Sequence, residues 1–151
     1  MVKWRSYIAL FRCRGGGDVI TRGGSKFAIV DGFYAYVGSC GNACAARIVR
    51  HLGKVVNRFW HVDYLHEICN EVAVMILPYT EEDVAKALLD KFPGIPGFGN
   101  SDKREDKTHL FRVGSGDETI IKILHELSMA IHKELSNGYS RKFNDHYNKS
   151  L

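Results

Sequence analysis

The sequence lacks the features of a membrane or secreted protein. None of its apolar runs approaches the roughly 18 residues that a membrane-spanning helix needs. The apolar stretch within the first fourteen residues has no small-residue cleavage site after it, so we interpret it as a first strand rather than a signal peptide. The sequence also has no internal repeat and no low-complexity segment. With 151 residues, 45% of them hydrophobic, it is long enough for one domain with its own core. We therefore expect a single cytoplasmic domain over 1–151.

Cysteine is scarce, and the four cysteines form no CxxC pair: they are Cys13, Cys40, Cys44 and Cys69. A chain of this size does not need disulfides for stability, so we expect reduced thiols. A zinc site built from Cys40, Cys44 and a histidine is the weaker alternative, because buried structural cysteine is the common case.

Residue patterns predict several short strands in the first half of the chain and one later. Ser6–Arg12 is rich in strand-forming residues, and 18–21 and 26–30 flank a Gly23-Gly24 turn. Alternation along 33–38 places Tyr34 and Tyr36 on one face of a strand. Glu71–Leu77 has the composition of a buried strand, and 109–113 that of a last strand.

Helical spacing predicts a helix from about Asn42 to Leu52, followed by a short one over 60–68. A third helix begins at Thr80, which has capping-box spacing to Asp83. Asp117 can cap a long C-terminal helix that ends at Gly138 and is followed by a basic tail. The first helix has one apolar side (Ala45, Ile48, Val49, Leu52), which we expect on the sheet, and one cationic side (Arg47, Arg50, His51, Lys54).

The formal charge of +4 is unevenly distributed. From 42 to 62 the charged residues are all cations: Arg47, Arg50, Lys54 and Arg58, accompanied by His51 and His61. A local excess of cations attracts polyanions such as nucleic acid. The alternative is an ordinary solvated helix face, and charge alone does not separate the two.

The motif Tyr36-Val37-Gly38, followed by Arg47 and then His51, resembles the signature of the GIY-YIG nuclease superfamily. The longer stretch GFYAYVGSCGNACAARIVRHL with FWHVDYL is similar to its Uri-type branch, as are TEEDVAKALL and GFGNSDKREDKTHLF. The resemblance covers roughly 6–113. It implies an α/β (α+β) fold, in which helices flank a small mixed or antiparallel sheet.

The resemblance also implies a site. The second-strand tyrosine maps to Tyr36, the helix arginine to Arg47, and the metal-binding glutamate to Glu81, with Glu82 as the register alternative. His51 lies one turn after Arg47, where the superfamily often has histidine. The first-strand tyrosine would be Tyr7, twenty-nine positions before Tyr36 rather than one hairpin away, and Tyr34 is its rival.

These residue types suit phosphodiester hydrolysis. Mg²⁺ or Mn²⁺ can be anchored by one carboxylate, and the arginine fork matches phosphate oxygens. A tyrosine beside a metal and an arginine can have its pKa lowered enough to accept a proton from water. The expected activity is a metal-dependent DNA endonuclease, acting on branched or damaged DNA among other substrates, with Arg50, Lys54, Arg58 and His61 contacting nucleic acid.

Each residue also has a plainer interpretation. The tyrosines can be strand aromatics, Arg47 and His51 a solvated helix face, and Glu81 a first-turn acid that favours the helix dipole. A metal triad of His51, His61 and Asp63 is a weaker possibility. The alternative function is a catalytically inactive nucleic-acid-binding module of the same fold.

Overall fold

The computed structural model describes residues 3–52, 61–99 and 108–136, except for the side chains of residues 51 and 52. A four-stranded antiparallel sheet has the order β5-β1-β4-β6, formed by β1 (Ser6–Cys13), β4 (Gly32–Ser39), β5 (Cys69–Leu77) and β6 (Leu110–Gly114). A separate hairpin pairs β2 (Gly17–Ile20) with β3 (Lys26–Ile29). The expected α+β fold with helices flanking an antiparallel sheet is confirmed.

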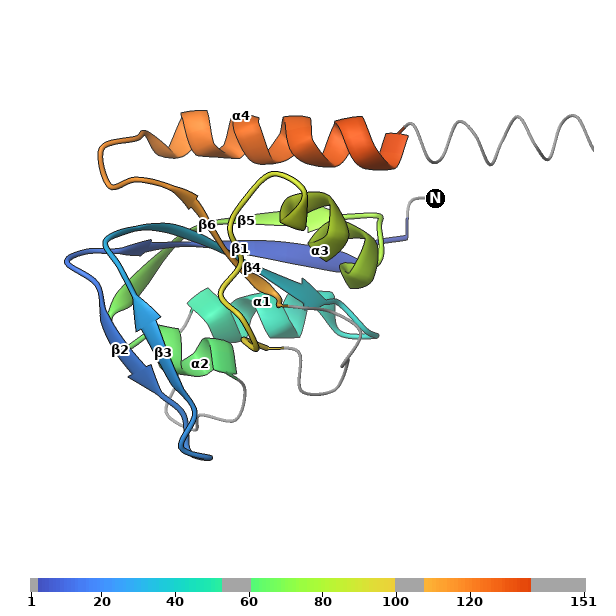
Figure 1. The fold of residues 1–151 in the computed structure, drawn as a ribbon. Coiled ribbons are helices and arrows are strands. Elements are labelled where there is room, and N and C mark those ends of the chain that lie inside the picture. Colours follow the sequence, from blue (N-terminus) through green and yellow to red (C-terminus); the bar gives the residue numbers. More distant parts are fainter. Residues whose placement is uncertain (1–2, 53–60, 100–107, 137–151) are drawn as a thin grey trace, which may run out of the picture.

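Alternation along the strands separates two apolar layers. Helices lie on both sides of the sheet (Figure 1). Ile8, Leu10, Ala35 and Val37 face α3 (Glu81–Leu89) and α4 (Ile120–Ile131). The opposite face, which includes Tyr7, Tyr34 and Tyr36, is covered by α1 (Cys44–Leu52), α2 (His61–Leu65) and the β2–β3 hairpin. We call these the helical face and the tyrosine face.

The N-terminal cap matches the expectation for α3 but not for α4. The Thr80 side chain accepts a hydrogen bond from the Asp83 backbone N–H and caps α3, as predicted. Thr119, not Asp117, caps α4 through Lys122 N–H. A π-helical segment, η1 (His132–Ser136), follows α4, and the predicted end at Gly138 and the basic tail lie outside the described residues.

Two expectations about burial are wrong. β5 is an edge strand with its outward side chains exposed, not a buried strand, because its second neighbour in the sheet order is missing among the described strands. On α1, Ile48 packs against the core of the tyrosine face, but Ala45 and Val49 are exposed. Only part of the apolar side of α1 therefore reaches the sheet.

The expectation of reduced thiols is also wrong for this structure. Cys13 and Cys69 form one disulfide, which joins the end of β1 to the start of β5. Cys40 and Cys44 form a second one, between the end of β4 and the start of α1, so neither thiol remains as a zinc ligand. Within the described ranges, no helix has the length and apolar character to cross a membrane.

Candidate active site

Tyr7 and Tyr36 lie on neighbouring strands and on the same face of the sheet. Tyr7 is opposite Gly38 in the β1–β4 register, and Tyr36 is opposite Ala9. The Tyr7 ring crosses Gly38 so closely that an added Cβ would be 2.3 Å from the ring carbon Cζ. The glycine of the Tyr-Val-Gly motif is therefore required by the position of the first tyrosine.

The surroundings of both phenols contain charged groups from distant parts of the chain. Burial raises the pKa of Tyr7 and of Tyr36, whose exposed fractions are 4% and 8%. The Arg47 guanidinium lowers both pKa values, while the carboxylates of Glu81 and Asp63 raise them. The expected site residues Tyr7, Tyr36, Arg47 and Glu81 are thus close enough to interact electrostatically.

The direction of the tyrosine pKa shifts differs from the expectation. A lowered pKa would have made a tyrosine a ready proton acceptor, but burial outweighs Arg47 at both positions. Both phenols are therefore protonated at neutral pH. In this state they can orient a water molecule or donate a hydrogen bond to a phosphate, and they do not act as bases without a further positive charge.

Arg47 is exposed at the start of α1 and leans over the loop that follows β4. Its Nη1 donates a hydrogen bond of 2.5 Å to the Ser39 carbonyl oxygen. Gly41, in the left-handed region with φ 53°, lies under the guanidinium, since an added Cβ would be 3.2 Å from Nη2. The backbone thus sets the direction of the Arg47 side chain, and most of its donors are left for a ligand.

Glu81 is the first residue of α3, and it interacts electrostatically with the phenols of the central strands β1 and β4. Its side chain is 12% exposed, and Oε2 is 3.9 Å from Nδ1 of buried His109. A Cβ added to Gly99 would be 3.4 Å from His109 Cβ and 3.0 Å from the Tyr36 ring. Gly99 therefore packs between Tyr36 and His109, and His109 lies next to Glu81. Glu81, the first choice over Glu82, acts electrostatically on both tyrosines, as Asp63 does.

Tyr34 is fixed by backbone contacts. Its ring is fully buried, and its hydroxyl donates to the Val30 carbonyl oxygen at 2.9 Å and accepts from the Val30 N–H at 3.0 Å. These bonds attach β4 to the end of the preceding hairpin. Tyr7, in contrast, lies among the charged groups.

Arg50 and Asp63 form an ion pair that links α1 to α2. Arg50 Nη2 is 2.6 Å from Oδ2 of Asp63, whose side chain is fully buried. A buried carboxylate needs such a partner, because its charge is costly away from water. Arg50 is thus committed in part to Asp63 and is a poorer contact for nucleic acid than its position on the helix suggests.

His61 is held by the loop before residue 100 and by two aromatic rings. Its Nδ1 accepts a hydrogen bond of 3.0 Å from the Gly99 N–H, and its ring lies 5.6 Å from that of Phe27 and 5.5 Å from that of Phe98. Burial lowers its pKa, so the ring is neutral. Within the described residues no group of three metal-ligating side chains occurs. The triad of His51, His61 and Asp63 stays a prediction, because the His51 side chain lies outside the described residues.

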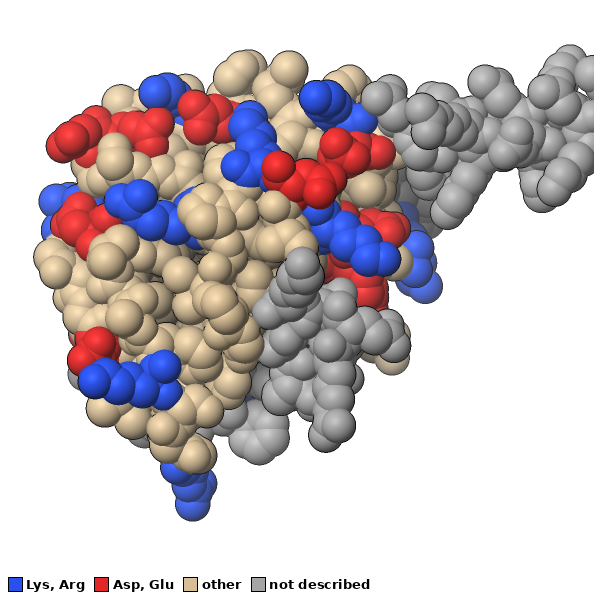
Figure 2. Space-filling view, in the orientation of Figure 1, with Lys and Arg blue, Asp and Glu red and all other residues tan. Residues whose placement is uncertain are grey.

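Some expected residues are only partly described. His51 belongs to α1, but its side chain lies outside the described residues, as do Lys54 and Arg58. The contribution of these three to a nucleic-acid surface stays a prediction. Around α3 and α4, Figure 2 shows side chains of both signs interspersed rather than a continuous basic area.

Glu71 is a further acidic residue of the tyrosine face that the sequence pattern did not single out. It is opposite Phe11 in the β1–β5 register, where the bulge between Leu10 and Phe11 turns it onto the same face as Tyr7. Both carboxylate oxygens are buried and make no hydrogen bond to the described part of the chain. Burial raises the pKa of Glu71 to about 7, and its charge raises the pKa of Tyr7. The lone glutamate in EVAVMIL was the available signal.

The class of protein follows from the fold and from one comparison. The described part is an antiparallel α+β domain with two phenols, a guanidinium and carboxylates beside one sheet face. The chain belongs to the family of the domain of unknown function DUF123, whose model matches residues 6–132. No curated protein and no solved structure matches the chain.

Proposed function

We propose that the chain is a metal-dependent endonuclease of the GIY-YIG type that hydrolyses DNA phosphodiester bonds. The observation that carries the proposal is the convergence of Tyr7, Tyr36, Arg47 and Glu81, which come from four different elements and act on one another electrostatically. The resemblance of the Tyr-Val-Gly, Arg and Glu motifs to those of GIY-YIG nucleases supports the same assignment.

Arg47 is the group that binds the phosphate. Its guanidinium is exposed, and only one donor is used by the Ser39 carbonyl oxygen. The remaining N–H groups can bind two phosphate oxygens at once, which neutralises charge and fixes the orientation of the scissile bond. Charge that develops on the phosphate during cleavage is stabilised by the same fork.

Glu81 is the residue that would hold Mg²⁺ or Mn²⁺. These ions prefer oxygen ligands and keep several waters, so a single carboxylate at the edge of a cleavage site is a sufficient anchor. The Glu81 side chain is 12% exposed, and its carboxylate raises the pKa of both tyrosines, so it lies in the same neighbourhood as the phenols. When bound, the ion supplies Lewis-acid stabilisation of the phosphate and its leaving oxygen.

Tyr7 and Tyr36 act through their hydroxyl groups. Both are protonated, because burial raises their pKa values, and each can donate one hydrogen bond and accept another. They can hold the attacking water in line with the phosphorus atom and exclude other solvent from the reaction. His51 stays a candidate for proton transfer on the basis of the motif.

Cleavage assays with purified protein test the proposal. Branched, nicked, single-stranded and duplex DNA are incubated with Mg²⁺ or Mn²⁺, and products are separated by denaturing gels. We expect metal-dependent cleavage of at least one substrate and a loss of about 100-fold or more in Arg47→Ala. Arg22→Ala, which removes an exposed arginine from the β2–β3 turn, is the charge-matched control. Equal cleavage rates for Arg47→Ala and wild type would refute the proposed endonuclease activity at this site.

The rival proposal is a nucleic-acid-binding module of the same fold without catalysis. The raised pKa values of both phenols favour it, because neither tyrosine is a base in this state. Such a module would bind DNA with an affinity that falls steeply with salt and does not depend on metal. Filter-binding at several salt concentrations, with and without EDTA, separates the two proposals when combined with the cleavage assay.

The proposal places the activity in the cytoplasm. The two disulfides are uncommon in that compartment, since its thiol systems keep cysteines reduced. Rapid alkylation of free thiols in lysed cells that express the chain, followed by mass spectrometry, tests the location. Labelling of all four cysteines is expected in a reducing cytoplasm, and complete protection would favour an oxidising one.

A further inference from the structure

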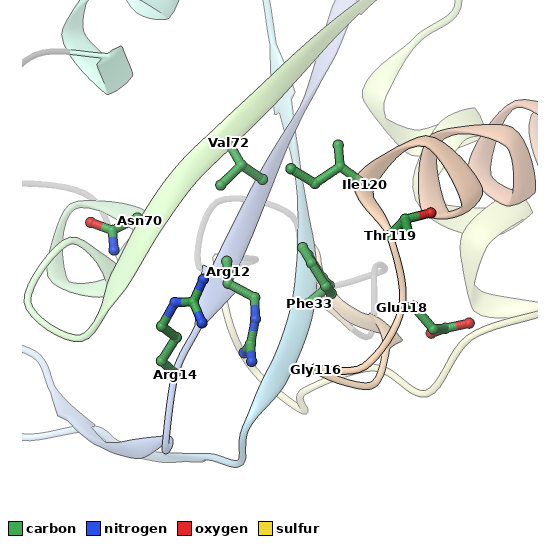
Figure 3. A pocket seen from close by; sticks show the side chains of 9 residues that line it. All are labelled: Arg12, Arg14, Phe33, Asn70, Val72, Gly116, Glu118, Thr119 and Ile120. Atoms are coloured by element: carbon green, nitrogen blue, oxygen red, sulfur yellow. The ribbon is translucent and has the colours of Figure 1, made fainter.

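A pocket of about 340 Å³ lies at the far end of β1, on the helical face. Figure 3 shows Arg12 and Arg14 beside β5, with Phe33, Thr119 and Ile120 across from them. Ile8, Leu10 and Arg12 are every second residue of β1, so Arg12 lies on the helical face with the other two. The pocket is therefore on the opposite side of the sheet from Tyr7 and Tyr36. Its volume is in the range of small-molecule sites.

Arg12 forms the floor and is already satisfied. Its Nη1 donates to the carbonyl oxygens of Cys13 at 2.7 Å and Gly32 at 3.2 Å, and Nη2 is 3.1 Å from Asp31 Oδ1. A hydrogen bond from the Gly15 N–H, together with Arg12, lowers the pKa of Asp31 and keeps it charged. The Arg12 guanidinium also lies 5.3 Å from the Phe33 ring centre, so the floor is rigid and electrically balanced.

The carboxylate at the rim is likewise compensated. Glu118 Oε1 is 3.1 Å from Lys122 Nζ, and Oε2 accepts a hydrogen bond of 2.9 Å from the Ser115 N–H. These contacts lower the pKa of Glu118 and keep its charge turned toward its own helix. Glu118 therefore does not cancel another cation of the pocket.

Arg14 is the cation that remains. Neither the Arg14 side chain nor the Asn70 side chain makes a hydrogen bond or ion pair within the described ranges, although the Arg14 charge also lowers the pKa of Asp31. With Arg12 balanced by Asp31 and Glu118 by Lys122, the pocket has one positive charge in excess. A guanidinium and a carboxamide together match the oxygens of a carboxylate or phosphate.

The rest of the lining is apolar. Val72 and Ile120 expose part of their side chains at the mouth, and Phe33 is buried at the base. Val72 is the extra residue of the β5 bulge, since Leu10 pairs with Ala73 and Phe11 with Glu71. Gly116 closes another wall: a Cβ there would lie 2.3 Å from Asp31 Oδ1. The turn before α4 is thus fitted onto the Arg12–Asp31 pair.

We infer that this pocket binds a small organic anion in which a carboxylate or phosphate is joined to an aromatic or aliphatic body. Arg14 and Asn70 hold the oxygens, and Val72 and Ile120 cover the body. An anion without an organic body would leave the apolar side chains of Val72 and Ile120 exposed to solvent. A neutral apolar molecule would leave the Arg14 charge without a partner in the pocket. The inference concerns a second site and does not rest on the nuclease proposal.

Titration of ¹⁵N-labelled protein, followed by amide and arginine Nε–H shifts, tests the pocket. The probes are phenyl phosphate and benzoate, which distinguish a phosphate ligand from a carboxylate ligand. Inorganic phosphate tests the anionic group alone, and benzyl alcohol tests the aromatic body alone. We expect saturable shifts at Asn70, Val72, Gly116 and Ile120 with one of the first two probes. Each half alone should bind at least about tenfold more weakly.

Variants assign the binding to the proposed groups. Arg14→Ala should weaken binding of the better probe about tenfold or more, and Asn70→Asp should weaken it further because it adds a negative charge. Arg22→Ala should leave it unchanged. Three results would each overturn the inference: no saturable shift at the pocket, equal binding by Arg14→Ala and wild type, or inorganic phosphate binding as tightly as phenyl phosphate and benzoate.

Discussion

The two faces of the four-stranded sheet are built from different kinds of residues. The middle of the helical face consists of aliphatic side chains such as Leu10 and Val37, which pack under α3 and α4. The tyrosine face is buried to a similar depth, but it includes the phenols of Tyr7, Tyr34 and Tyr36 and the carboxylates of Asp63 and Glu71. Buried polar groups lower stability unless they are well paired. One face thus provides stability, while the other keeps groups whose presence is best explained by function.

Truncation on the helical face should give the largest loss of stability. Leu10 is fully buried, and Leu10→Ala removes three carbons from packed surroundings, for an expected loss of about 3–4 kcal/mol. On the tyrosine face, Tyr36→Phe keeps the ring and should change stability by less than about 1 kcal/mol. Urea unfolding followed by circular dichroism measures both, and similar losses would contradict the contrast between the faces.

Substitution of Glu71, in contrast, should stabilise the protein. The folded-state pKa of about 7 is above the ordinary value of 4.5, so the unfolded chain loses this proton first and the penalty grows as pH rises from 4.5 to 7. We expect Glu71→Gln to raise the free energy of unfolding by about 2–3 kcal/mol at pH 8. The gain should disappear below pH 4.5, where both side chains are neutral. A gain that is equal at pH 4 and pH 8 would exclude burial of this charge as the cause.

The smallest of the three effects concerns the ion pair between α1 and α2. Arg50→Ala leaves the buried Asp63 charge without this partner and should cost about 2 kcal/mol, less than for a fully enclosed pair because Arg50 is 40% exposed. Combining it with Asp63→Asn removes the charge and should recover most of the loss. Thermal unfolding of both single variants and the double variant measures the coupling, and strict additivity would show that the pair contributes nothing.

The sequence predicted the helices and strands themselves better than it predicted which elements lie next to one another. Alternation along β4 correctly placed Tyr34 and Tyr36 on one face, and capping-box spacing identified Thr80. Thr119 was missed because Asp117 is an equally suitable cap by residue type, and only the backbone decides between them. The edge position of β5 depends on the strand order, which local periodicity does not contain.

The candidate site shows the same limit. The resemblance to GIY-YIG nucleases pointed to Tyr7, Tyr36, Arg47 and Glu81, and the structure brings these four into one electrostatic neighbourhood. Burial determines the protonation of the tyrosines, and it follows from packing that no single motif reveals. The pairing of Arg50 with Asp63 is also a contact between separate helices, so a cation on a helix surface was taken for a free one.

The Cys13–Cys69 bond encloses the chain from the end of β1 to the start of β5 in a covalent ring. A single proteolytic cut anywhere inside this ring leaves the two pieces tethered, so the nicked protein migrates as one species on a non-reducing gel and as two after reduction. Because the tether joins strands that are neighbours in the sheet, the pieces stay at a high effective concentration and can keep their native arrangement after the cut.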